Sequence, residues 1–163
     1  METPRLALRW TLWATLTLSG KRLGSVVTLN GTTSSDPDNG PGPLTFSWTK
    51  ASGPAVSLSG ATTAKPTFTP TVVGKYVFNL IVNDGLNNSV PASVTITVPK
   101  LGDIDLDGDV DLLDLAKIAV MANKNASGPN DLRDLNGDGK INLPDLRMFP
   151  TLCTRPLCLP VKH

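Results

Sequence analysis

The sequence predicts a multi-domain protein in which an all-β sandwich precedes a small α module made of two acidic loop–helix repeats. A length of 163 residues suits two small modules better than one large enzyme core. Short segments of alternating apolar and polar residues, separated by turn residues, fill residues 24–98. Ten of the thirteen aspartates then fall between Asp103 and Asp145. We therefore expect an N-terminal segment at 1–22, a β domain at 23–99 and an α module at 100–160.

The N-terminal segment allows two interpretations. Arginines at positions 5 and 9, an apolar stretch from Trp10 to Leu18 and small residues at Ser19 and Gly20 outline a secretory signal peptide. The same stretch alternates apolar residues with threonine, as an atypical first strand of the sandwich would. No later segment has the eighteen or so apolar residues of a membrane span.

Period-two alternation predicts which face of each strand is buried. The segments SVVTLNG, LTFSWTK, AKPTFTP, KYVFNLIVNDG and SVTITV read as strands, and this spacing of short strands suits a sandwich. The apolar residues expected to share a face within their strands are Val27, Leu29, Leu44, Phe46, Trp48, Tyr76, Phe78, Leu80, Val82, Val94, Ile96 and Val98.

The stretches LNGTTSSDPDNGPGPLTFSWTKASGP, GKYVFNLIVNDG and SVTITV resemble the PKD-like, immunoglobulin-like (Ig-like) repeats of bacterial secreted and cell-surface proteins. The resemblance covers about residues 24–98 and implies a non-catalytic spacer or adhesion module. We expect Trp48 to be a core residue rather than a ligand platform. Asp36, Asp38 and Asp84 are either turn-forming aspartates, the favoured interpretation, or ligands of a third ion.

Two segments of the α module share the spacing of a calcium-binding loop. A hard cation needs about six to eight oxygens, which a twelve-residue loop supplies by turning sharply at a glycine in sixth place and offering a carbonyl in seventh place. The first loop offers Asp103, Asp105, Asp107, the Asp109 carbonyl, Asp111 and Asp114, and the second offers Asp134, Asn136, Asp138, the Lys140 carbonyl, Asn142 and Asp145. The eighth residues, Val110 and Ile141, are apolar, as expected if the paired loops form a short β contact. The sequence thus predicts two Ca²⁺ ions in EF-hand-like loops.

Loop followed by helix, repeated at a spacing of 31 residues with aspartate in twelfth place, is similar to the type I dockerin module over residues 102 to about 155. The resemblance implies that these residues hold calcium and that the helices bind a cohesin-like protein module. The residues implied to face that partner are Leu112, Leu113, Ala119, Val120 and Lys124. Alternatively, this extra apolar face of the first helix rests on the sandwich domain. Pro150 is expected to limit the second helix to about six residues, which argues against a symmetric docking surface.

The other residues that could take part in catalysis do not favour an enzyme. Cys153 and Cys158 are the only cysteines, and an export context would let them form a disulfide, with two unpaired thiols as the alternative. The sole histidine is the C-terminal His163, so neither a zinc site nor a nucleophile–histidine pair can be assembled. A net charge of +1 without a basic run excludes a nucleic-acid binder.

The sequence therefore predicts a secreted or cell-surface, non-catalytic, calcium-binding docking protein with a cohesin-like partner, linked to polysaccharide degradation complexes or surface assembly. Two alternatives remain open: a calcium-stabilised adhesion or stalk fragment, and the C-terminal piece of a larger glycoside hydrolase.

Overall fold

The computed structural model describes residues 17–18, 21–36, 42–154 and 158, and it divides into two compact units. The first unit comprises mainly Val26–Thr69 and Lys75–Ile96, and the second contains the chain from Thr97 on, with Leu18–Ser25 and Pro70–Gly74. The signal-peptide interpretation falls almost wholly outside the described residues. Of the alternating stretch, Thr17–Leu18 is described and forms a strand.

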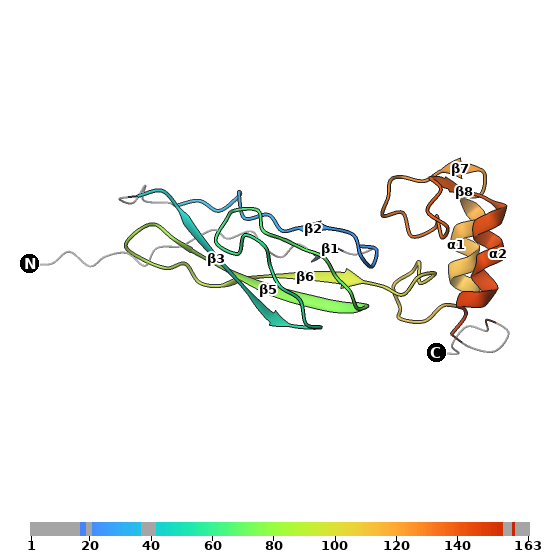
Figure 1. Cartoon of the computed structure of the whole chain (residues 1–163), viewed down its shortest axis with the longest axis horizontal. Coiled ribbons are helices and arrows are strands. Elements are labelled where there is room, and N and C mark those ends of the chain that lie inside the picture. The colour runs from blue at the N-terminus through green and yellow to red at the C-terminus, as the bar shows by residue number, and fades with distance from the viewer. Residues whose placement is uncertain (1–16, 19–20, 37–41, 155–157, 159–163) are drawn as a thin grey trace, which may run out of the picture. The chain divides into compact units, whose positions relative to one another are not determined.

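Two sheets build the first unit (Figure 1). The larger sheet has the strand order β1-β6-β5-β3, and the smaller one pairs β2 with β4. The strands are β1 Thr17–Leu18, β2 Val27–Thr28, β3 Thr45–Ser52, β4 Thr67–Phe68, β5 Gly74–Asn83 and β6 Ala92–Val98. β3 and β5 run antiparallel with Trp48 opposite Leu80, and β2 and β4 run antiparallel with Val27 opposite Phe68.

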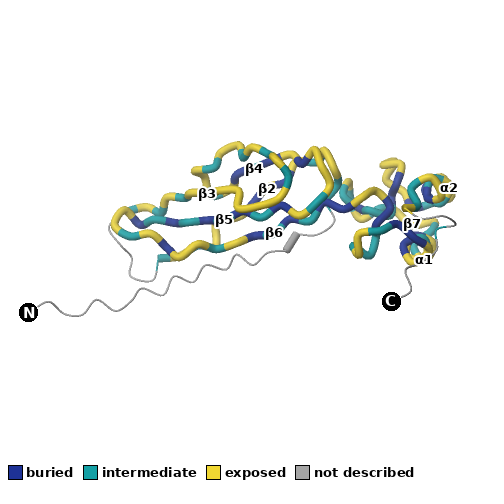
Figure 2. The backbone as a smooth tube through the Cα atoms, turned by 90° about the horizontal axis from the view of Figure 1, so that it is seen from below, coloured by how far each residue is buried: buried dark blue, intermediate teal, exposed yellow. Residues whose placement is uncertain are grey.

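The expected alternation is present on the central strands, where buried and less buried residues succeed one another along the backbone (Figure 2). In β5 every second residue, from Tyr76 to Val82, is fully buried, because the alternating side chains of a strand point to opposite faces. Phe68 brings the sheets together, since its ring centroid lies 5.4 Å from that of Tyr76 and 4.8 Å from that of Phe78. Trp48 is buried and its Nε1 donates to the carbonyl of Thr63 at 3.2 Å, so it is a core residue as predicted.

The second unit contains two helices and a two-stranded ribbon. These elements are α1 Leu112–Val120, β7 Lys124–Asn125, β8 Lys140–Ile141 and α2 Leu143–Leu152. Each helix begins directly after an acidic loop, because the backbone N–H of the residue before the helix is held by an aspartate three residues later. In α1 the cap is complete, since the Asp111 side chain also accepts from the N–H of Leu113 at 2.7 Å.

The expected β contact between Val110 and Ile141 is wrong. Ile141 pairs instead with Lys124, in the chain that follows α1, and its carbonyl accepts from the N–H of Asn123 at 2.7 Å. Val110 makes the equivalent contact with the chain that follows α2, where the N–H of Thr154 donates to its carbonyl at 3.2 Å. Each loop is therefore bridged to the exit of the opposite helix, and the contacts obey the 31-residue repeat of the sequence.

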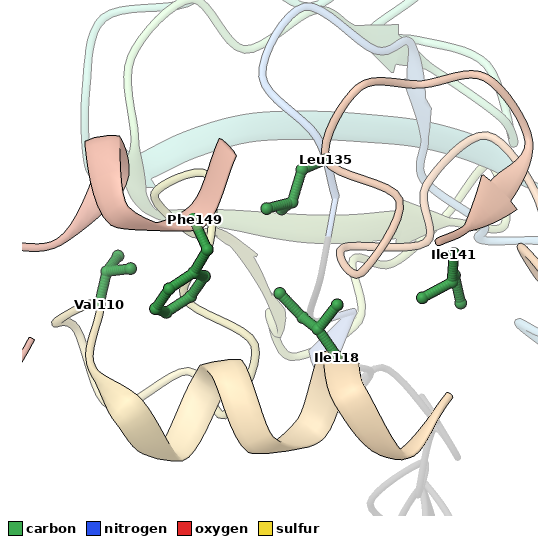
Figure 3. Packing of buried hydrophobic residues seen from close by; sticks show 5 residues of the cluster. All are labelled: Val110, Ile118, Leu135, Ile141 and Phe149. Atoms are coloured by element: carbon green, nitrogen blue, oxygen red, sulfur yellow. The ribbon is translucent and has the colours of Figure 1, made fainter. Parts of the chain in front are cut away.

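Equivalent positions of the two repeats also form the core of the second unit (Figure 3). Ile118 and Phe149 lie 31 residues apart and are both fully buried, as are Val110, at 1 % exposure, and Ile141. Leu135 completes the buried cluster, and half-buried Ile104 at the corresponding position of the first repeat packs against it. The sequence repeat is thus a repeat of core positions as well as of acidic residues.

The expected length of the second helix is also wrong, because α2 continues through Pro150 and has ten residues. Proline removes one backbone hydrogen bond, but here it lies in the last turn, where few further bonds depend on it. The hydroxyl of Thr151 donates to the Met148 carbonyl at 2.6 Å, and Leu152 packs against the core. Burial of Phe149, at 0 % exposure, stabilises the helical conformation that the following proline disfavours.

A disulfide joins Cys153 to Cys158, whose Cα atoms lie 5.3 Å apart, and both residues pack against the core. It ties Cys158 to the end of α2, next to Thr154 and its contact with Val110. No helix within the described ranges is long and apolar enough to cross a membrane.

Replacing Phe149 with alanine is expected to destabilise the second unit by about 3–5 kcal/mol, because it removes a large buried side chain and leaves a cavity. Urea unfolding followed by far-ultraviolet circular dichroism measures the change. Leu143→Ala, at a position that is 55 % exposed, is the control and should cost less than about 1 kcal/mol. Equal effects of the two substitutions would contradict the assigned core.

Candidate metal centre

The first acidic loop brings its carboxylates together. Ligand oxygens of Asp103, Asp105 and Asp114 all lie within 4.8 Å of one another, as do those of Asp109, Asp111 and Asp114. Asp114 belongs to both groups, so the two sets of oxygens converge on the start of α1. Such a set of oxygen donors matches the chemistry that a hard divalent cation requires.

Asp114 also connects the loop to the helix. Its Oδ1 accepts from the backbone N–H groups of Ile104 at 2.6 Å and Asp105 at 3.0 Å, while its Oδ2 accepts from Asp111 N–H at 2.9 Å. One carboxylate therefore holds the beginning and the end of the loop. This is possible because Asp114 lies in the first turn of α1, which fixes the direction of its side chain.

In the first loop, one oxygen on each of two aspartates is buried without a hydrogen-bond partner. These are Oδ1 of Asp103 and Oδ1 of Asp105. Asp103 as a residue is only 3 % exposed, which makes an unpartnered oxygen costly. Burial, and next to it the neighbouring carboxylates, raises the pKa of Asp105, and burial likewise raises the pKa of Asp103.

Lysines provide some positive charge near this loop. Lys117 Nζ lies 3.9 Å from Asp105 Oδ2, and Lys100 Nζ donates to the Gly108 carbonyl at 2.8 Å. The Lys117 side chain is 49 % exposed, and a pair of this kind contributes about 0–1 kcal/mol. The lysines therefore do not offset the repulsion among the carboxylates.

The second loop satisfies more of its polar groups internally. Asp134 accepts from the backbone N–H groups of Gly137, Asp138 and Gly139 at 2.8–3.1 Å. The amide of Asn136 donates to Asp138 Oδ2 at 3.0 Å, and this bond, the largest cause, lowers the pKa of the Asp138 carboxyl.

Asp145 repeats the role of Asp114, accepting from Asn136 N–H at 3.1 Å and from Asn142 N–H at 2.8 Å. Asn142 Oδ1 is buried without a partner, as are Oδ1 of Asp103 and Oδ1 of Asp105. The residues predicted to bind the second calcium ion therefore belong to one hydrogen-bonded loop. Within the described part of the chain, however, the close groups of three acidic side chains occur only in the first loop.

Asp131, which the sequence reasoning did not single out, organises the connection between the repeats. This buried carboxylate accepts from the N–H and hydroxyl of Ser127 and from Nε and a terminal nitrogen of Arg133, at 2.8–3.0 Å. The Arg133 guanidinium, as the largest cause, holds the pKa of Asp131 well below its usual range. The available signal was an aspartate two residues before an arginine in the turn-rich sequence ASGPNDLRD.

The other predicted sites have different outcomes. Asp84 Oδ1 accepts from Leu86 and Asn87 N–H groups at 2.7 and 2.6 Å, so it is a turn-forming aspartate, while Asp38 lies outside the described residues. All five residues predicted to face a partner are exposed on or just after α1. Among them, Leu113 is 52 % and Val120 is 79 % exposed.

The first unit has the sheet-rich fold of an Ig-like domain, and its sequence shows which family of such domains it matches. Residues 21–98 match the family described as "K319L-like, PKD domain". This part of the chain is therefore a PKD-like domain, as the sequence resemblance predicted. The family match ends before the acidic loops.

A stretch of 86 residues is 30% identical to "Ulvan lyase, long isoform" of Glaciecola sp. (strain KUL10), covering 53% of this chain and 8% of that protein. The chain thus spans a small fraction of this curated relative. Among solved structures, the PKD domain from KIAA 1837 protein matches with a TM-score of 0.43 and 28% identity, covering 60% of this chain and 91% of that one. A putative alpha-galactosidase from Bacteroides fragilis NCTC 9343 matches with a TM-score of 0.42 and 14% identity over 61% of this chain and 19% of that one.

Asp131→Asn is expected to lower the free energy of unfolding by about 1.5–3 kcal/mol at neutral pH, because it removes the charge that Arg133 and Ser127 bind. The folded-state pKa of Asp131 is depressed, so its contribution is complete above the unfolded-state pKa of about 3.9 and is lost as the pH falls through the folded-state value. The difference between wild type and variant should therefore persist at about pH 5 and shrink below about pH 4. Urea unfolding at several pH values measures it.

The exposed substitution Lys124→Gln is the control and should show no such pH dependence. A difference for Asp131→Asn that grows on acidification would contradict the assigned charge interaction.

Proposed function

We propose that the second unit is a non-catalytic, calcium-binding docking module, carried on a PKD-like spacer domain and acting outside the cytoplasm. The observation that carries the proposal is the first loop, where carboxylate oxygens of Asp103, Asp105 and Asp114 lie within 4.8 Å of one another and Oδ1 of Asp103 is buried without a partner. A cation coordinated there would satisfy this oxygen and neutralise the surrounding like charges. Calcium suits the site because every donor is an oxygen. The donors also have the spacing of a twelve-residue calcium-binding loop that turns at a glycine in sixth place.

The donor set fits two ions. The first would be held by the five carboxylates Asp103, Asp105, Asp107, Asp111 and Asp114 with the Asp109 carbonyl, and the second by Asp134, Asn136, Asp138, Asn142 and Asp145 with the Lys140 carbonyl. The bound ions would supply charge neutralisation and would fix the first turn of each helix. Asp114 and Asp145 are well placed for this role, because each already joins its loop to its helix.

The partner proposed for α1 is a cohesin-like protein module, on the strength of the dockerin resemblance. The exposed apolar side chains of Leu112, Leu113 and Val120 support a protein partner, because a helix of a small module normally exposes a polar face. The α2 positions equivalent to Leu113, Ala119 and Val120 are Pro144, Pro150 and Thr151, so the second helix offers a less apolar face despite its full length.

A second candidate is an appendage of a larger polysaccharide-degrading enzyme. The observation that favours it is the similarity of part of the chain to a protein named as an ulvan lyase. In this case too the residues described above would bind and position rather than catalyse. The disulfide between Cys153 and Cys158 supports an extracellular setting for either candidate.

Removing calcium with a chelator is expected to lower the melting temperature of the second unit and reduce its helical circular dichroism. Ligand binding to the folded state alone contributes about 4 kcal/mol when the free ion exceeds its dissociation constant a thousandfold. Calorimetric titration of the full chain should find two ions. Unchanged melting with and without chelator, together with no calcium binding, would refute the metal sites.

The double change Leu113→Asp and Val120→Lys is expected to abolish binding to a cohesin module, because it puts charges at the centre of the apolar face. Calcium affinity and melting temperature should stay nearly as in the wild type, since both side chains are exposed. Surface-immobilised cohesin modules provide the measurement.

On α2, the changes Leu143→Asp and Thr151→Lys, at the positions equivalent to Leu112 and Val120, should weaken binding only slightly. If the α1 double variant keeps its binding, the assigned face is wrong. If it loses stability as an isolated protein, that face is packed within the molecule and the stalk interpretation is favoured.

A further inference from the structure

We propose that the two loops are unequal calcium sites: the first binds calcium tightly and fills first, and the second is a weaker site that fills at higher calcium. This inference rests on the calcium-binding function proposed above and concerns how that site responds to the ion. The two loops have the same spacing of ligand residues, but they differ in charge and in internal hydrogen bonding, and the inference is based on these differences.

Charge is the first difference. The first loop contains six carboxylates, at Asp103, Asp105, Asp107, Asp109, Asp111 and Asp114. The second contains three, at Asp134, Asp138 and Asp145, together with the cationic side chain of Lys140. The number of charged ligands is one of the two properties by which such loops tune calcium affinity. A divalent cation therefore gains more electrostatic energy in the first loop than in the second.

Internal hydrogen bonding is the second difference, and it acts in the same direction. In the second loop, Asn136 Nδ2 already donates to Asp138 Oδ2 at 3.0 Å. A calcium ion bound there competes with this bond. In the first loop, Oδ1 of Asp103 and of Asp105 are buried without any partner, so the ion replaces no existing contact at these atoms.

The unpartnered oxygen of the second loop does not reverse this order. Asn142 Oδ1 is neutral, and leaving a neutral acceptor unsatisfied costs less than leaving a buried carboxylate unsatisfied. Lys117 is the one cation paired with a carboxylate of the first loop among the described residues, and its exposed, 3.9 Å contact with Asp105 is readily displaced.

Calcium titration of the metal-stripped full chain by isothermal calorimetry tests the proposal. We expect two classes of site whose dissociation constants differ at least about tenfold, which corresponds to about 1.4 kcal/mol. The double change Asp105→Asn and Asp107→Asn should remove the tight class and leave the weak class. Asp138→Asn should do the reverse.

The substitution Asn136→Asp tests the same proposal by strengthening the second calcium site, so that its result does not depend on damaging a loop. It adds a carboxylate to the second loop and removes the donor to Asp138, so it should tighten the weak class at least about threefold and leave the tight class unchanged. Two sites of equal affinity, or loss of the tight class on Asp138→Asn, would overturn the inequality while leaving the calcium function intact. A complete absence of binding would instead overturn the proposed function itself.

Discussion

The carboxylate in twelfth place of each loop is the constraint on which the second unit depends. Asp114 accepts hydrogen bonds from the start of its loop and from the residue just before its helix, and Asp145 does the same in the second repeat. Both residues are almost fully buried, at 1 % and 0 % exposure. Because the carboxylate belongs to the first turn of the helix, the path of the loop and the direction of the helix are determined together. The short helices can then meet through Ile118 and Phe149, which lie one turn further on.

The second unit combines this polar frame with a small core. Five fully or nearly fully buried apolar residues form its centre, which is little for a module of this size. The buried carboxylate of Asp131, the disulfide and the contacts between each loop and the opposite helix exit supplement it. The PKD-like domain differs in this respect, because alternation along β5 and β6 and the contact of Phe68 with two aromatic rings give it a continuous apolar interior.

Much of the fold was predictable from the sequence because its signals are periodic. Alternation identified the buried face of β5 and β6, and the 31-residue repeat identified both loops and the helices that follow them. Three features were not predictable in this way. Pro150 suggested a short helix from local propensity, whereas burial of Phe149 maintains the helix to Leu152.

The pairing of Val110 and Ile141 with the opposite helix exits, and the hydrogen bonds of Asp131, are tertiary contacts for which a single sequence gives no direct signal. The candidate metal site, in contrast, could be predicted from the sequence, because the ligands of each loop lie within one continuous segment.

The crossed contacts between the repeats make neither repeat an autonomous folding unit. Loop one is closed by Thr154, at the far end of the other repeat, and loop two by Asn123, at the end of the first. A frameshift or proteolytic cut after α2 begins would therefore damage not only the helix that it shortens but also the first loop at Val110, 44 residues before Thr154 in the sequence. We therefore expect duplication or transfer of this gene segment to preserve the folded module only when both repeats and the chain through Thr154 are kept together.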